Sequence, residues 1–151
     1  MNAANFLAAT NPTSTIILAN HRTPSSTFAR NMSDSEPETE YELESFEIAG
    51  RNFEITTIAY LPIELLMANR EKQTEISGQK LWCGSLGVIQ HILNNPSLVL
   101  DHTVVEIGAG TGVLGMICKI TGASTVILTD HDTISINHMV ADCARNKIEA
   151  Q

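Results

Sequence analysis

Apolar and polar residues alternate regularly from about residue 45, and the alternation first has a period of two. Phe46 and Ile48 lie on either side of a glutamate, as do Phe53 and Ile55, and a Gly-containing segment at 49–52 separates the two runs. Alternation on both sides of such a turn predicts a β-hairpin with one apolar and one polar face.

After the hairpin, apolar residues recur at the spacing of a helix in two places. Pro62, with apolar residues at 65–67, predicts a short helix, because proline is tolerated in the first turn of a helix. Residues 69–80 are polar and predict a loop. Ser85 can cap a second helix, which ends before Pro96 because the residue preceding a proline avoids the helical conformation. The apolar positions of this second helix are Leu86, Val88, Ile89, Ile92 and Leu93.

The remaining sequence has the order strand, glycine loop, helix, strand, acid, helix. Residues 103–107 and 125–129 are β-branched runs of the kind found in buried parallel strands. Gly122 stands where a glycine would end the first helix, and Asp132 or Thr133 can cap the second. This order predicts an α/β fold: the N-terminal half of a Rossmann-like, doubly wound parallel sheet, preceded by the hairpin and helices.

The charge is distributed unevenly along the chain. Nine Lys and Arg oppose seventeen Asp and Glu among 151 residues, which gives a formal net charge of −8. Residues 1–33 contain no acid, whereas 34–47 contain seven. We therefore expect residues 1–44 to form a disordered tail and residues 45–151 to form the folded, incomplete domain. The acid-free stretch also has the composition of an organelle transit peptide, and a start at Met32 would exclude it from the protein.

Composition excludes several classes of function. The acidic balance argues against nucleic-acid binding, which needs a basic face. No apolar run approaches the ~18 residues of a membrane span, and the run at 16–19 is too short for a secretory signal. Three cysteines without C-x-x-C spacing predict neither disulfides nor zinc, and favour the cytoplasm, with mitochondria or the nucleus as alternatives. His138 and Asp142 lack a second ligand pair, so we expect no metal site.

The glycine loop after residue 107 carries the candidate chemistry. Gly108, Gly110 and Gly112 stand at alternate positions and allow a ligand to approach the backbone. The helix that follows presents N–H groups and a partial positive charge to an anionic group. Asp130, at the end of the second strand, can accept both hydroxyl groups of a ribose. The loop therefore fits an adenosine-like nucleoside with an anionic end.

Two registers of the loop predict different cofactors. Residues 110–115 match G-x-G-x-x-G, which indicates a dinucleotide and an NAD(P)-dependent oxidoreductase. The strand ends at Ile107, however, and the glycines that fit the turn follow E-x-G-x-G-x-G from Glu106. A carboxylate there is unfavourable beside a pyrophosphate and favourable beside the ammonium and sulfonium groups of S-adenosylmethionine. Charge therefore favours the methyl donor, and the dinucleotide stays as the alternative.

These motifs resemble a known family. Glu106–Gly112 resembles motif I of the seven-strand (class I) S-adenosylmethionine-dependent methyltransferases. Gly78-Gln79-Lys80-Leu81-Trp82, followed by a helix, resembles the G-x-x-x-W segment that precedes motif I in methyltransferase family 16, the small protein-lysine methyltransferases. The hairpin also resembles the short N-terminal β element of that family, so the resemblance covers residues 45–147.

The resemblance implies a protein-lysine N-methyltransferase that uses S-adenosylmethionine and acts on a protein substrate. Within it, Glu106 and the loop would surround the methionine end, Asp130 would bind the ribose, His131 would lie beside the adenine, and Trp82 would lie at the mouth of the pocket. From packing alone, Trp82 could equally be a core aromatic residue. The implied cofactor-binding residues are Trp82, Glu106, Gly108, Ala109, Gly110, Thr111, Gly112, Asp130 and His131.

The resemblance also indicates what is missing. The sequence supplies two parallel strands of a seven-strand fold and has no counterpart of the D-x-x-Y-type motif that family 16 carries after its fourth strand. We therefore assign no catalytic residue and expect a truncated domain with an open sheet edge, exposed apolar surface and marginal stability. A non-catalytic fragment that binds a partner through that edge is a third hypothesis.

Overall fold

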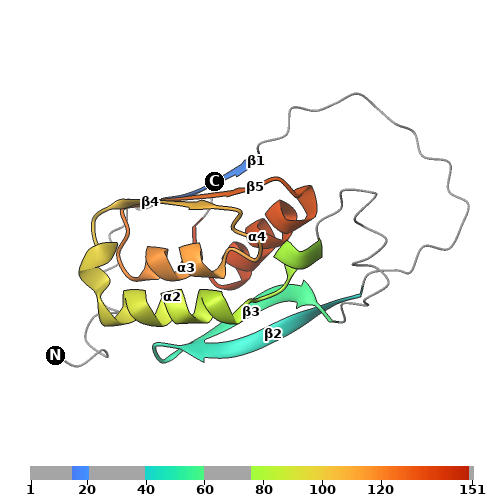
Figure 1. The fold of residues 1–151 in the computed structure, drawn as a ribbon, viewed down its shortest axis with the longest axis horizontal. Coiled ribbons are helices and arrows are strands. Elements are labelled where there is room, and N and C mark those ends of the chain that lie inside the picture. Colours follow the sequence, from blue (N-terminus) through green and yellow to red (C-terminus); the bar gives the residue numbers. More distant parts are fainter. Residues whose placement is uncertain (1–14, 21–39, 60–75, 150–151) are drawn as a thin grey trace, which may run out of the picture.

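The computed structural model describes residues 15–20, 40–59 and 76–149. Figure 1 shows three layers: a parallel sheet, a layer of helices and a β-hairpin. Within these ranges, no helix combines the length and apolar character needed to cross a bilayer. The elements in chain order are β1 (Thr15–Asn20), β2 (Tyr41–Ile48), β3 (Arg51–Ile58), the 3₁₀ helix η2 (Ile76–Gln79), α2 (Cys83–Asn94), the 3₁₀ helix η3 (Pro96–Leu98), β4 (Thr103–Ile107), α3 (Val113–Ile120), β5 (Thr125–Asp130) and α4 (Thr133–Arg145).

The parallel sheet contains the strand–helix–strand unit that the sequence predicts. β4 leads through α3 to β5, and the two strands pair in parallel with Val104 opposite Val126. Gly122 follows α3 with a φ of 109°, a conformation that suits glycine at the end of a helix. Asp132 caps α4, because its carboxylate accepts two backbone N–H groups of the first turn. The expected Rossmann-like α/β arrangement is confirmed in this part of the chain.

The N-terminal segment adds a third strand to this sheet. β1 pairs in parallel with the free side of β5, with Thr15 opposite Thr125, so the strand order is β1-β5-β4. The expectation that residues 1–44 form a tail is wrong for β1 and for the first residues of β2. The physical reason is that a short continuous apolar run such as 16–19 suits a strand in a buried parallel sheet. Such a run shows no alternation of apolar and polar residues, so the pattern did not identify it as a strand.

The hairpin is confirmed, and the start of one helix is corrected. β2 and β3 pair antiparallel, and Phe53 and Ile55 of β3 are fully buried. α2 begins at Cys83 rather than after Ser85, and no side chain caps its N-terminus. The short helix predicted from Pro62 lies outside the described residues.

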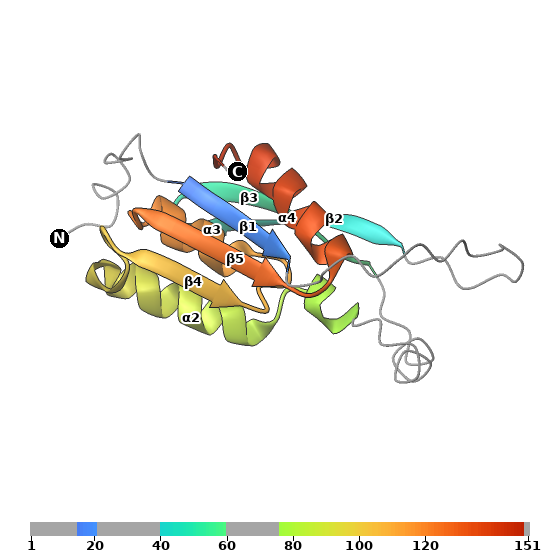
Figure 2. The ribbon, with the colours of Figure 1, turned by 90° about the horizontal axis from the view of Figure 1, so that it is seen from above.

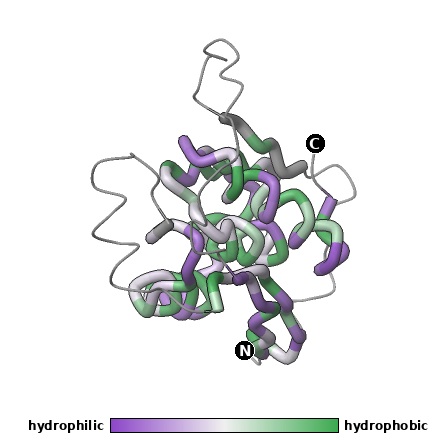
Figure 3. Tube along the Cα trace, turned by 90° about the vertical axis from the view of Figure 1, so that its right-hand side faces the viewer, coloured by the Kyte–Doolittle hydropathy of each residue, from purple (hydrophilic) through white to green (hydrophobic). Residues whose placement is uncertain are grey.

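The α-helices cover one face of the parallel sheet, as Figure 2 shows from the opposite side. In Figure 3, where the helices are seen nearly end-on, hydrophobic and hydrophilic positions alternate around the coils. Met116 and Ile117 of α3 and Leu128 of β5 are fully buried between the layers. On the face that no described helix covers, Val105 is 55% and Ile107 is 86% exposed. The expected exposed apolar surface is therefore present at β4.

Side chains in and just after the last turn of α4 fix the hairpin to the helix layer. The fully buried carboxylate of Asp142 accepts the backbone N–H and the hydroxyl of Thr56, each at 2.8 Å. The side-chain amide of Asn146 accepts the N–H of Glu54 at 3.0 Å and donates to its carbonyl at 2.7 Å. These two side chains satisfy backbone groups on the outer edge of β3, which would otherwise be left without partners.

Replacing Asn146 by alanine should therefore destabilise the fold. Asn146→Ala removes both bonds to Glu54, and we expect the free energy of unfolding to fall by about 1–3 kcal/mol. Asn94→Ala is the matched control, because Asn94 makes only an exposed bond to Gln90 within its own helix, and its effect should stay within about 0.5 kcal/mol. Urea denaturation compares the two, and equal midpoints would contradict this account of the hairpin.

Candidate functional site

The glycine loop between β4 and α3 is tightly enclosed. Gly108, Gly110 and Gly112 all have positive φ, at 68°, 56° and 69°. A Cβ atom on Gly110 would collide with the carbonyl oxygen of Gly78, and one on Gly112 would lie 2.7 Å from Cγ of Met139. At Gly110 the obstacle is backbone, so packing within the chain already requires glycine there, whereas at Gly112 the obstacle is the flexible side chain of Met139. Only at Gly108 would a side chain point into open space.

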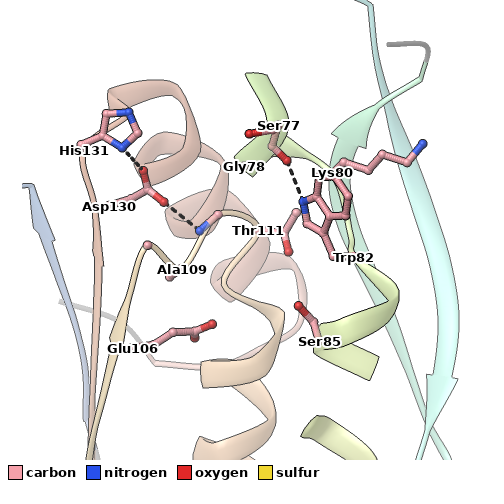
Figure 4. Close-up of a pocket in the computed structure, with 12 residues that line it drawn as sticks. Ser77, Gly78, Lys80, Trp82, Ser85, Glu106, Ala109, Thr111, Asp130 and His131 are labelled. Carbon is pink, nitrogen blue, oxygen red and sulfur yellow. Dashed lines mark hydrogen bonds and ion pairs between the residues drawn. The ribbon is translucent and has the colours of Figure 1, made fainter. Parts of the chain in front are cut away.

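A cavity of about 290 Å³ opens beside this loop (Figure 4). Asp130 and His131 lie on the side of β5, Trp82 and Ser85 lie on the side of α2, and the loop runs between them. Eight of the nine predicted site residues line the cavity, and Gly112 lies at the N-terminus of α3 outside it. The lining residues are Ser77, Gly78, Lys80, Trp82, Ser85, Glu106, Gly108, Ala109, Gly110, Thr111, Asp130 and His131.

Asp130 joins the loop to the strand that follows it. One carboxylate oxygen accepts the N–H of Gly110 at 2.8 Å, and the other accepts the N–H of Asp132 at 2.9 Å. The Nδ1 atom of His131 lies 3.3 Å from the second oxygen. A carboxylate offers about four acceptor positions, so Asp130 can hold the loop and still accept hydroxyl groups of a ligand.

Glu106 places a second carboxyl group at the base of the cavity. Its Oε2 accepts the N–H of Gly115 in the first turns of α3, at 2.9 Å. Burial raises the pKa of Glu106 to about 7; the bond from Gly115 opposes this rise, and the charge of Asp130 adds to it. A cationic group placed beside Glu106 would favour the ionised carboxylate. The cavity therefore suits a ligand that carries positive charge near β4.

Trp82 forms part of the rim of the cavity. Its side chain is 54% exposed, and its indole N–H donates to the carbonyl of Ser77 at 2.9 Å. The alternative that Trp82 is a core aromatic residue is therefore wrong. A half-exposed indole with a fixed orientation offers a flat apolar surface to a ligand.

Sequence reasoning missed three polar residues of the cavity: Ser77, Lys80 and Ser85. Ser77 and Lys80 lie in and after η2, in a segment that the pattern predicts only as a loop. Ser85 points its hydroxyl toward the cavity from the first turn of α2 instead of capping that helix (Figure 4). Their position next to or within the G-x-x-x-W segment, with Ser77 just before it, Lys80 inside it and Ser85 shortly after it, was the available signal. Among the described residues, no cluster of three or more His, Cys, Asp or Glu is arranged to hold a metal.

The fold is a Rossmann-like α/β domain with a cavity beside its glycine loop. The family model described as lysine methyltransferase matches residues 63–151, which is more than half of the chain, and the chain belongs to this family. The resemblance drawn from motif I and the G-x-x-x-W segment is thereby confirmed.

Three curated relatives show how much of a longer protein the match covers. The electron transfer flavoprotein beta subunit lysine methyltransferases of Homo sapiens and Danio rerio are each 28% identical over 67 residues, 44% of this chain and 26% of the relative. A protein N-terminal and lysine N-methyltransferase of Neurospora crassa is 34% identical over 55 residues, 36% of this chain and 20% of the relative. The chain thus matches between a fifth and about a quarter of the length of these relatives.

The raised pKa of Glu106 predicts a dependence of stability on pH. Between the ordinary pKa of 4.5 and about 7, the folded chain keeps a proton that the unfolded chain has released. The free energy of unfolding therefore falls as pH rises through this window, and Glu106→Gln removes that loss while keeping an acceptor for Gly115. We therefore expect the free energy of unfolding of Glu106→Gln, measured relative to that of the wild type, to be higher at pH 8 than at pH 5.

Urea denaturation at the two pH values tests this prediction. Glu47→Gln, at an exposed position on β2, is the control and should follow the wild-type profile. A constant difference between wild type and Glu106→Gln at both pH values would show that the carboxyl is not held protonated by the fold.

Proposed function

We propose that this chain binds S-adenosylmethionine and forms the cofactor-binding half of a protein-lysine N-methyltransferase. One observation carries the proposal: the carboxyl groups of Glu106 and Asp130 and the half-exposed indole of Trp82 line the same cavity beside one glycine loop. Family membership supports the methyl donor as cofactor. The dinucleotide alternative is weaker, because a pyrophosphate brings no positive charge to Glu106 and would oppose the ionisation of its carboxyl.

The residues of the cavity have separate roles in this proposal. Asp130 accepts the ribose hydroxyls with the acceptor positions that the loop leaves free, and His131 lies beside the adenine. Glu106 balances the positive charges of the methionine end, while the N–H groups of the loop are near its carboxylate. When bound, S-adenosylmethionine supplies a methyl group activated by the sulfonium charge. Trp82 covers the ligand from the side of α2 and limits the access of water.

The acceptor in this proposal is a lysine side chain of a protein. The printed names of two relatives specify the electron transfer flavoprotein beta subunit for those proteins, and for this chain we propose only the class of substrate. Methyl transfer needs a neutral amine in line with the methyl group, so the protein contributes mainly proximity and orientation. We assign no catalytic residue within the chain, and we propose neither nucleic acid nor a membrane as a partner. The cytoplasm is the proposed compartment.

Cofactor binding is tested with a matched pair of glycine variants. Isothermal titration with S-adenosylhomocysteine should show binding to the wild type, and NAD should show none. Gly110→Ala forces a Cβ against the carbonyl of Gly78, so we expect the affinity to fall at least about tenfold, which is about 1.4 kcal/mol. Gly87→Ala meets no atom within 4 Å, and should keep the affinity and stabilise α2 by about 0.5–1 kcal/mol.

Three outcomes would contradict the proposal. Equal affinities in Gly110→Ala and Gly87→Ala would remove the loop from the binding site. NAD binding without any response to S-adenosylhomocysteine would select the oxidoreductase. Failure of a folded wild type to bind either cofactor would leave the non-catalytic fragment, for which the exposed Val105 and Ile107 of β4 offer a surface.

A further inference from the structure

η2 is a single turn of 3₁₀ helix that is held on three sides. The indole N–H of Trp82 donates to the carbonyl of Ser77. The carbonyl of Gly78 lies directly against the backbone of Gly110. The side chain of Gln79 is buried, with 2% of the residue exposed. Since Ser77 and Gly78 both line the cavity, η2 is one wall of the candidate cofactor site.

The Gln79 amide connects two elements that are far apart in the sequence. The hydroxyl of Tyr41 on β2 donates to its Oε1 at 2.7 Å, and its Nε2 donates to Oδ2 of Asp132 at 2.7 Å. The hydroxyl of Ser135 donates to the same Asp132 oxygen at 2.8 Å. Because a donor faces one end of the amide and a carboxylate faces the other, only one of its two orientations satisfies both neighbours. We call Tyr41, Gln79 and Asp132 the Gln79 bridge.

The state of Asp132 supports this arrangement. Burial raises the pKa of Asp132, but the bonds from Ser135 and Gln79 outweigh burial and leave the pKa below its ordinary value. A charged acceptor makes the bond from Gln79 stronger than a bond between neutral groups. Tyr41 is further held by an edge-on contact with the ring of His138, with centroids 4.6 Å apart.

The hydrogen bonds continue from the bridge into the site itself. The backbone N–H of Asp132 donates to one oxygen of Asp130 at 2.9 Å, and the other oxygen accepts the N–H of Gly110 at 2.8 Å. An unbroken chain of hydrogen bonds thus runs from Tyr41 on the hairpin to the glycine loop. The hairpin contributes no residue that lines the cavity, yet its Tyr41 is connected through Gln79 and Asp132 to the carboxylate that we assign to the ribose.

We propose that Gln79 is a positioning residue for the cofactor site, and that the Gln79 bridge sets the places of Asp130 and Trp82 from the hairpin. The inference rests on the proposed function, because positioning matters only if the cavity binds the cofactor. Gln79 acts through Asp132 on one side and through Ser77 on the other, and it touches neither the cavity nor its ligand directly.

The test uses Gln79→Met, which keeps an unbranched side chain of similar size but removes both polar atoms. Gln90→Met on α2 is the matched control, because Gln90 is exposed and bonds only to Asn94. Trp82 is the single tryptophan of the chain, so its fluorescence reports on the wall of the cavity without any ligand. We expect Gln79→Met to shift the Trp82 emission, to increase its quenching by acrylamide, and to weaken S-adenosylhomocysteine binding about tenfold.

Tyr41→Phe is the second variant, because it removes one hydroxyl and keeps the ring contact with His138. We expect the same changes at a smaller size, with affinity about threefold weaker. If Gln79→Met does not fold, Tyr41→Phe decides whether the Gln79 bridge positions the site. The proposal is overturned if the folded variants match Gln90→Met in both fluorescence and affinity. If the wild type binds no S-adenosylhomocysteine, the proposed function fails, and the quenching comparison still decides whether the bridge positions Trp82.

Discussion

The geometry of the site depends on the two hydrogen bonds that Asp130 accepts. One comes from Gly110 in the loop after β4, and the other comes from Asp132 at the start of α4. Because Asp130 is buried, the loss of either bond would leave part of a charge without a partner, which is costly where water is scarce. The carboxylate thereby holds the glycine loop, the start of α4 and the end of β5 in one arrangement.

The parts of this fold that the sequence predicted are those whose signal is local. The hairpin follows from a period of two around Phe53 and Ile55, and the strand–helix–strand unit follows from β-branched runs separated by glycines and helical spacing. The cavity followed for the same reason, since E-x-G-x-G-x-G and Asp130 belong to neighbouring elements. The pattern overstated one point: the carbonyl of Gly78 leaves no room for a side chain at Gly110, whatever the loop binds.

The parts that could not be predicted depend on partners that are distant in the sequence. The four apolar residues at 16–19 show no alternation with polar residues, and they form a strand through their pairing with β5. Gln79 lies in a polar run that is typical of a solvated loop, and it is buried only because Tyr41 and Asp132, 38 and 53 positions away, satisfy both ends of its amide. Trp82 offers no periodic signal, so packing arguments left it open as a core aromatic residue; only the resemblance of the G-x-x-x-W segment placed it at the mouth of the pocket, where the structure has it.

The pairing of β1 with β5 has a consequence for the order of folding. The segment from β4 to α4 is continuous in sequence, and its contacts require the closure of only short loops, so it can assemble early. The pairing of Thr15 with Thr125, in contrast, requires the closure of a loop that spans most of the chain. Of the described strands, β1 leaves the ribosome first, and its partner β5 emerges more than a hundred residues later. Among the described strands, β1 is therefore made before β4 and β5 but joins their sheet last, and the edge of β5 that β1 covers is open until then.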